Sequence, residues 1–366
     1  MRLILDVKTL NAGIATVIKS LSSRPALPVL EGIYLCASQE GLLLRCSDLS
    51  LQIECTVPAT VEEEGATVLP GRLFAEMARK FPGETVDLKL DGHTMTMKAG
   101  RAVTKLQCME PREYPDMAVV GKTTSLSMPQ KALKDMIRQT VFATAQEESK
   151  PILTGVLCEL DQNIFTMVAL DGFRLALRRY GVNVSADRKE AVVPAKSFLE
   201  ISRTLIDVED AVEVQFSPTH LLINMGHTRI VSRLLDGDFI KYKSILPSEH
   251  LTRVRINRDE LLESIDRAML MAREGSNNLV RFSVSEDLLK LTANSALGRI
   301  DEEIGMHLNG DPIEIAFNAR YFADVLKTLD DDEIFLDMNN NVSPCVVRPT
   351  QGEAYYYLIL PVRIFA

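Results

Sequence analysis

The sequence contains no tryptophan, and aromatic residues make up only 6% of its 366 residues. It therefore offers no aromatic-rich stacking platform, and no zinc-finger, recognition-helix or RNP-type motif is present. No apolar run approaches the length of a membrane-spanning helix. Any contact with nucleic acid is expected to be made to phosphates, without sequence preference.

Cysteine and histidine are also scarce, with six and five residues. No two cysteines form a C-x-x-C pair, and the histidines show no H-E-x-x-H or other metal-ligand spacing, so no metal site is predicted. Six cysteines spread over a long chain are typical of reduced thiols in a cytosolic protein. The N-terminal MRLILDVKTLNAG does not fit a signal peptide. We expect a cytoplasmic protein with no cofactor.

Two short segments resemble functional motifs without completing them. GKT at 121–123 would need a glycine five residues earlier to form a P-loop, and Asp116 stands there. DDDE at 330–333 lacks the spaced acids and glycine of a calcium loop and predicts a solvated turn. No Ser-His-Asp or Cys-His arrangement can be argued, so the sequence predicts no active site.

Self-similarity is the main positive signal. Three segments share a basic residue at the fourth place, Phe at the sixth and an acid at the eighth: LPGRLFAEM from Leu69, VPAKSFLEI from Val193 and FNARYFADV from Phe317. Three others open with a polar turn and continue at helical spacing: LDVKTLNAGI from Leu5, MPQKALKDMI from Met128 and INRDELLESI from Ile256. A third trio is Asp48, Asp171 and Asn294, expected to lie in structural turns. All recur at about the same interval.

The chain is therefore predicted to be α+β, with three tandem copies of one domain at 1–121, 122–248 and 249–366. Each copy divides into two halves that pair a helix with antiparallel strands. The expected helices are 7–20, 71–81, 129–142, 195–205, 257–273 and 319–328. The phrases EPREYPDM and LDGDFIKYKSILP, before the two borders, are expected to be the closing strand ends of a domain.

Charge is unevenly distributed between helices and the rest. The chain has a net charge of −9, but the six helical windows sum to +7 and the remainder to −16. A polyanion would therefore meet the helices. The alternative explanation of the basic helices is that Lys and Arg are common in helices because of their high helix propensity.

Domain size limits how such copies could surround a duplex. A domain of this length is roughly 35 Å across, and six in a closed ring leave a hole of roughly 35 Å. That hole passes a duplex about 20 Å wide with water around it, whereas a ring of three leaves only roughly 5 Å. Two chains joined head to tail would close the ring of six.

Several segments resemble the bacterial sliding clamp family, the beta subunits of DNA polymerase III. They are SRPALPVLEGIYL with Arg24, the CSDLS step at Asp48, ALDGFRLA at 169–176, LLDGDF at 234–239 and LILPVRI at 358–364. The resemblance implies a non-catalytic processivity factor. It implies a head-to-tail homodimeric ring with helices lining the hole and double-stranded DNA inside. Implied partners are the replicative polymerase catalytic subunit, the ATP-driven clamp loader and other proteins with a clamp-binding motif; no membrane partner is implied.

The resemblance also implies a hydrophobic pocket for client peptides between the second and third domains. Its residues would be Leu153, Leu170, Gly172, Phe173, Arg174, Leu175, Ile240, Ile245, Tyr321, Val342, Leu358, Leu360 and Pro361. The apolar C-terminal run YYYLILPV fits such a pocket, and it also fits a plain buried closing strand. Phe173 stands where the family commonly has His, Ile240 where it has Pro, and the chain continues through Phe365 and Ala366.

For DNA, the resemblance selects Arg24 and Lys196, and the repeat adds Arg72 and Arg320. Arg24 could instead cap its own loop. The runner-up function is a repeat-built scaffold that binds peptides without surrounding DNA. A hydrolase is disfavoured because the residue constellations it would need are missing.

Overall fold

The computed structural model describes residues 1–366 except 23, 119–120, 122–123, 148–149, 276–277 and 364–366, and it describes no side chain at 185–187. The expected border at 121/122, most of the GKT segment and the terminal Phe365 and Ala366 therefore lie at or outside the described residues. No described helix is long and apolar enough to span a membrane.

The six predicted helices are confirmed, and each ends somewhat earlier than its predicted window. They are α1 (Val7–Val17), α2 (Gly71–Ala78), α3 (Gln130–Arg138), α4 (Ala195–Thr204), α5 (Arg258–Ala272) and α6 (Ala319–Leu326). Helices α2, α4 and α6 each begin at the third residue of the repeated motif. The motif's phenylalanines are all buried, which explains their recurrence: Phe74, Phe198 and Phe322.

In two segments of the other trio, those of α1 and α5, the polar opening turn acts as a helix cap. The carboxylate of Asp6 accepts a hydrogen bond from the Thr9 amide at 2.8 Å, and the Asn257 side chain accepts one from the Glu260 amide at 3.0 Å. Each bond satisfies an amide that the first helical turn cannot pair by itself. The repeated polar residue therefore fixes where α1 and α5 begin.

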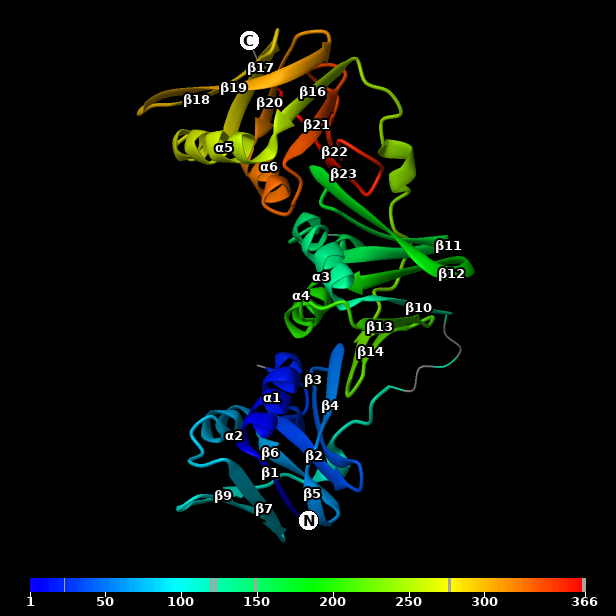
Figure 1. Cartoon of the computed structure of the whole chain (residues 1–366), viewed down its shortest axis with the longest axis vertical. Helices are drawn as coiled ribbons and strands as arrows, with labels where there is room; N and C mark the ends of the chain where they lie inside the picture. The colour runs from blue at the N-terminus through cyan, green and yellow to red at the C-terminus, as the bar shows by residue number, and fades with distance from the viewer. Residues whose placement is uncertain (23, 119–120, 122–123, 148–149, 276–277, 364–366) are drawn as a thin grey trace. The chain divides into compact units, whose positions relative to one another are not determined.

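The chain packs as two compact units, and the first contains 1–131 and 196–234. Its five-stranded antiparallel sheet runs in the order β5 (Thr60–Glu63), β1 (Arg2–Asp6), β7 (Thr85–Asp91), β8 (Thr94–Ala99), β9 (Ala102–Gln107). Its eight-stranded sheet runs in the order β10 (Thr124–Pro129), β13 (Ala211–Phe216), β14 (His220–Met225), β15 (Thr228–Arg233), β4 (Leu51–Val57), β3 (Gly41–Ser47), β2 (Gly32–Ser38), β6 (Gly65–Pro70). Helices α1 and α2 pack against each other, and α1 also packs on β3 and β4 (Figure 1).

The second unit contains 132–195 and 235–366 and is built on one ten-stranded sheet. The order is β11 (Gly155–Leu170), β12 (Arg174–Pro194), β23 (Tyr355–Ile359), β22 (Cys345–Pro349), β21 (Glu333–Met338), β16 (Thr252–Asn257), β19 (Gly298–Gly310), β18 (Leu288–Ser295), β17 (Leu279–Ser285), β20 (Ile313–Asn318). Helices α5 and α6 pack on each other and on strands of this sheet (Figure 1). Phe322 of α6 meets Phe282 and Phe317 with ring centroids 4.9 Å apart.

These units cut across the sequence repeats. Sheets continue from one copy to the next, since β15 pairs with β4 and β12 pairs with β23. The second copy therefore contributes 122–131 and 196–234 to the first unit and 132–195 and 235–248 to the second. The pairing of β12 with β23 matters for function, because the candidate peptide pocket lies around it.

Two expectations about local structure were wrong. EPREYPDM and LDGDFIKYKSILP are not strand ends but loops that contain the 3₁₀ helices η3 (Pro111–Glu113) and η6 (Tyr242–Ile245). Proline at the first position of η3 fixes φ and has no N–H to give a strand. The remaining 3₁₀ helices are η1 (Ile18–Ser20), η2 (Pro28–Glu31), η4 (Val141–Ala143) and η5 (Pro151–Thr154).

The expectation of structural turns holds for two of the three repeated positions. Asp48 accepts from the amides of Ser50 and Leu51, and Asp171 accepts from those of Phe173 and Arg174. Asn294 instead lies near the end of strand β18. All six cysteines are free thiols.

Candidate functional site

The second unit exposes a set of large apolar side chains that belong to the predicted pocket. Between 37% and 60% of each is open to solvent: Phe173, Ile240, Ile245, Val342 and Leu360. Exposed apolar residues that gather on one surface mark a site for a partner more often than singly scattered ones do.

Other predicted pocket residues are buried in the core of the second unit. Leu153, Leu170, Leu175 and Leu358 belong to one hydrophobic cluster, together with Tyr242. Strand β23 is therefore a buried closing strand through Ile359 and becomes exposed at Leu360. The interpretation of the run as a buried closing strand is confirmed through Ile359, and its part in a peptide pocket stays a prediction.

The pairing of β12 with β23 brings the two sides of the surface together. Leu175 lies opposite Leu358 and Arg174 opposite Ile359, and the Leu360 amide donates to the Phe173 carbonyl at 2.9 Å. Beyond Leu360, Pro361 has no N–H to extend the ladder. The chain then turns so that the Val362 amide donates to the Ala316 carbonyl at 2.8 Å.

Arg174 is the main polar group of the site and is only 11% exposed. Its guanidinium donates to the Asp171 carboxylate at 3.0 Å, to the Asp324 carboxylate at 2.6 Å and to the Phe142 carbonyl at 2.8 Å. It also lies over the Phe142 and Tyr321 rings, 5.3 and 4.7 Å from their centroids. All these partners fix its position, because a planar guanidinium donates in fixed directions.

Phe173 and Tyr321 form an aromatic wall beside Arg174. Their rings are nearly parallel, with an interplanar angle of 23° and centroids 6.2 Å apart. Burial raises the pKa of Tyr321, so its hydroxyl stays neutral. Gly172, with φ +93°, makes the turn that places Phe173 outward, a conformation that other residues rarely adopt.

Sequence reasoning missed several residues that hold the site together. Phe142 and Asp324 both contact Arg174, and Glu159 contacts the η6 turn. Asp324 could have been found, because it is the acid at the eighth place of the repeated motif. Phe142 contributes its backbone carbonyl, for which no sequence signal exists.

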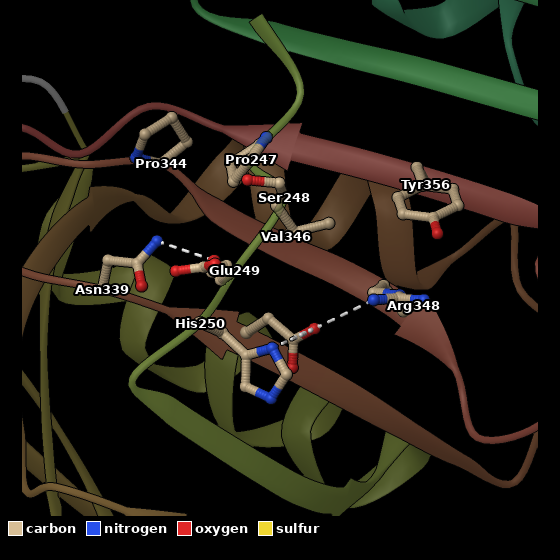
Figure 2. Close-up of a pocket in the computed structure, with 10 residues that line it drawn as sticks. Pro247, Ser248, Glu249, His250, Asn339, Pro344, Val346, Arg348 and Tyr356 are labelled. Carbon is tan, nitrogen blue, oxygen red and sulfur yellow. Dashed lines mark hydrogen bonds and ion pairs between the residues drawn. The ribbon is translucent and has the colours of Figure 1, made fainter.

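The second unit also contains a polar pocket (Figure 2). It is lined by segment 247–250 and by residues of β21 to β23, including Val346 opposite Leu358 and Tyr356 two residues before it. At its base the buried Asp337 accepts from Arg253 at 2.7 and 2.8 Å, with Arg348 at 3.5 Å and His250 at 3.8 Å. The Asn339 amide group binds the Glu249 carbonyl at 2.9 Å and the Leu251 amide at 3.0 Å, and so fixes segment 249–251.

The four candidate DNA residues are all exposed. Arg72 and Arg320 lie in the first turn of α2 and α6, and Arg24 lies in the loop before η2. None of these three guanidiniums forms an ion pair with a residue in the described part of the chain. The Lys196 ammonium is 80% exposed but lies 2.9 Å from the Asp48 carboxylate. The described residues contain no cluster of three His, Cys, Asp or Glu that could hold a metal ion.

Three similar two-helix copies joined by continuous sheets define the class of DNA clamps. The comparisons with known proteins give the family. Models of the DNA polymerase III beta subunit match residues 1–118 (N-terminal domain), 127–241 (central domain) and 243–363 (C-terminal domain). The chain belongs to this family.

The relatives are similar over their whole length. The beta sliding clamp of Bacillus subtilis is 33% identical over 378 residues, which is 100% of both chains. The solved structure of the Bacillus subtilis sliding clamp has a TM-score of 0.97 at 32% identity and full coverage of both chains. The Pseudomonas aeruginosa clamp bound to griselimycin has a TM-score of 0.95 at 26% identity, again covering 100% of each chain.

Proposed function

We propose that this protein is a processivity factor, a homodimeric ring that surrounds duplex DNA and tethers the replicative polymerase. It catalyses no reaction itself. The observation that carries the proposal is the full-length match to beta sliding clamps, with three domain copies in the same order. The mechanism is topological: a ring holds DNA without tight local contacts, and a bound polymerase gains effective concentration at the primer end.

Two open strand edges support head-to-tail closure. In the first unit, β9 lies at the end of its sheet and exposes Val103. In the second, residues 298–305 of β19 pair only with β18 among the described strands, because β16 pairs with 306–310. An uncovered edge beside exposed apolar residues is a template for pairing with another chain.

The two edges carry opposite charges. Around β9 stand Lys98, Arg101 and Lys105, whereas residues 298–305 of β19 contain three acids, at 301–303, and one base, Arg299, which pairs with Asp301. Such an arrangement favours β9 of one chain against β19 of another and disfavours each edge against its own copy. A heterologous contact used twice closes a dimer.

A charge-exchange experiment tests this closure. Variant one, Arg101→Glu/Lys105→Glu, makes the β9 edge acidic, and variant two, Glu263→Lys/Glu303→Lys, makes the β19 side basic. Glu263 belongs there because Arg267 joins it to Glu302. Each variant alone is expected to weaken dimerisation in sedimentation velocity, whereas their mixture restores a heterodimer. Dimers in both variants alone, or no dimer in the mixture, would refute the assignment.

The apolar surface around Phe173, Ile245 and Leu360 is the proposed site for client peptides. It offers a hydrophobic floor, exposed apolar walls and a fixed Arg174, which is what a short linear peptide needs. Clients include the polymerase catalytic subunit and other proteins with a clamp-binding motif, and the ATP-driven clamp loader competes for the same place. A truncation that removes 358–366 is expected to abolish peptide binding and leave a dimer; surviving affinity would place the site elsewhere.

DNA contacts are proposed at Arg24, Arg72, Lys196 and Arg320. Their exposure leaves them able to reach phosphates, and Lys196 must exchange Asp48 for a phosphate to do so. Charge reversal at Arg24 and Lys196 is expected to weaken loading or sliding. Unchanged behaviour in both variants would remove these two residues from the assignment.

The domain borders 1–121, 122–248 and 249–366 and a cytoplasmic location complete the proposal. The borders are supported by the recurrence of helix starts at Gly71, Ala195 and Ala319. The location is supported by the six free cysteines and by the role in replication.

The central experiment measures retention on DNA. The protein is loaded by its cognate clamp loader with ATP onto closed circular plasmid, and half of the sample is then linearised. Retention on the circle with rapid loss from linear ends is expected. Equal loss from both, or equal salt-sensitive retention on both, would favour a peptide-binding scaffold or ordinary surface binding.

A further inference from the structure

One buried carboxylate outside the apolar surface has contacts that lead directly to it. Glu159 lies on β11 and is only 3% exposed. Its two oxygens accept hydrogen bonds from the Tyr242 hydroxyl at 3.1 Å and from the Lys243 ammonium at 2.6 Å. Arg188 lies 3.5 Å away. A carboxylate is buried at a cost unless it is paired, and here two of its partners are adjacent residues of η6.

The η6 turn has little to stabilise it by itself. It is a single 3₁₀ turn of four residues with no side-chain cap. Such short turns have poor hydrogen-bond geometry and persist when tertiary contacts hold them. Tyr242 provides such a contact, because its ring lies in the hydrophobic cluster with Leu358. Burial and the neighbouring Glu159 raise the pKa of Tyr242, so its hydroxyl remains a donor.

The same turn presents two exposed residues of the client site. Ile240 precedes η6 and Ile245 ends it, and both are exposed, whereas Phe239, Tyr242 and Leu246 face the cluster. The segment is therefore held from below by its buried members and projects the isoleucines outward. Downstream, Asn339 and the residues of the polar pocket fix 249–251 (Figure 2).

We propose that Glu159 is a positioning residue of the client-peptide site: by binding Tyr242 and Lys243 it sets where Ile240 and Ile245 stand. This inference rests on the proposed function. Glu159 is covered and touches no peptide; it acts through the turn. Loss of its contacts does not change the isoleucine side chains, but it leaves the η6 turn less ordered. A bound peptide must then order the turn, which lowers the affinity for the peptide.

The test uses the full-length dimer and one probe, the fluorescently labelled polymerase catalytic subunit. Glu159→Gln keeps the side-chain shape and an acceptor for Tyr242 but removes the charge that binds Lys243, and Tyr242→Phe removes only the hydroxyl. Each is expected to weaken polymerase binding by about three- to tenfold. The matched control is Glu190→Gln, the exposed carboxylate opposite Glu159 on β12, which pairs with Arg188 and does not contact η6. It is expected to leave affinity unchanged.

A double-mutant cycle separates positioning from general destabilisation. In the Ile245→Ala background, the loss from Glu159→Gln is expected to shrink by at least half, since part of what Glu159 positions is then absent. Undiminished loss in that background, or wild-type affinity for both Glu159→Gln and Tyr242→Phe, overturns the proposal. Failure of the wild-type protein to bind the polymerase catalytic subunit would instead reject the client site itself, so the two failures are distinguishable.

Discussion

Removal of the Arg174 guanidinium is the sharpest test of how the client site is assembled. Arg174→Met keeps most of the aliphatic volume but deletes three hydrogen bonds and the contacts with two aromatic rings. It leaves Asp171 and Asp324 without their partner. Breaking a buried ion pair costs about 3–5 kcal/mol. Because Asp324 is 30% exposed and can rehydrate, we expect about 3 kcal/mol.

For a folding unit of roughly 200 residues, that loss lowers the midpoint of thermal unfolding by about 6–12 °C. Circular dichroism measures the midpoint, and the affinity for the polymerase catalytic subunit is measured below it. Arg179→Met is the matched control on the same strand: Arg179 pairs with the exposed Glu353, so its loss should cost less than about 1 kcal/mol.

The coupling between Arg174 and Asp324 gives a second measurement. Asp324→Asn should cost about 1–2 kcal/mol more in the wild-type background than in the Arg174→Met background. In the Arg174→Met background the Asp324 carboxylate has already lost its partner. A loss below about 1 kcal/mol for Arg174→Met, or full additivity with Asp324→Asn, would show that the guanidinium is not the link between β12 and α6.

Four further perturbations have definite expected outcomes. Phe322→Ala, in the aromatic cluster of the third copy, should cost about 3–5 kcal/mol of unfolding free energy in urea denaturation, whereas Phe173→Ala should cost less than about 1 kcal/mol and still lower client affinity. Hydrogen bonds from Thr9 lower the pKa of Asp6 in the folded protein. The ionised Asp6 therefore stabilises the fold above the unfolded pKa of about 4, and this stabilisation is lost as the pH falls further. Asp6→Asn should flatten that part of the curve of unfolding free energy against pH. Burial raises the thiol pKa of Cys46, Cys158 and Cys345, so a thiol reagent should leave them unmodified in the native protein and react after unfolding; rapid native reaction would contradict the packing.

The repeated sequence motifs predicted the helix starts accurately because the residue at a given motif position has one structural role. Phe198 fills the same core position as Phe74, and Asn257 caps its helix as Asp6 does. The repeat could not predict the lengths of β11 and β12. In the second copy, β11 continues through the position at which the first copy has a turn between two strands, and its register shifts near Gln162. A register irregularity of this kind leaves no periodic signal in the sequence.

In the candidate site, too, some residues could be predicted from the sequence and others became apparent only from the structure. Exposed apolar residues such as Ile245 could be predicted because they stand in short segments that resemble a family. Their anchors could not, because Glu159 lies 84 residues from Lys243 and looks like any acid on a strand. Only folding shows that its carboxylate is buried and that its partners lie in the turn which carries Ile245. In the proposed client site, a substitution at Ile240 or Ile245 is expected to change the surface that a peptide meets, whereas a substitution at Glu159 is expected to change how firmly that surface is held. The double-mutant cycle separates the two effects.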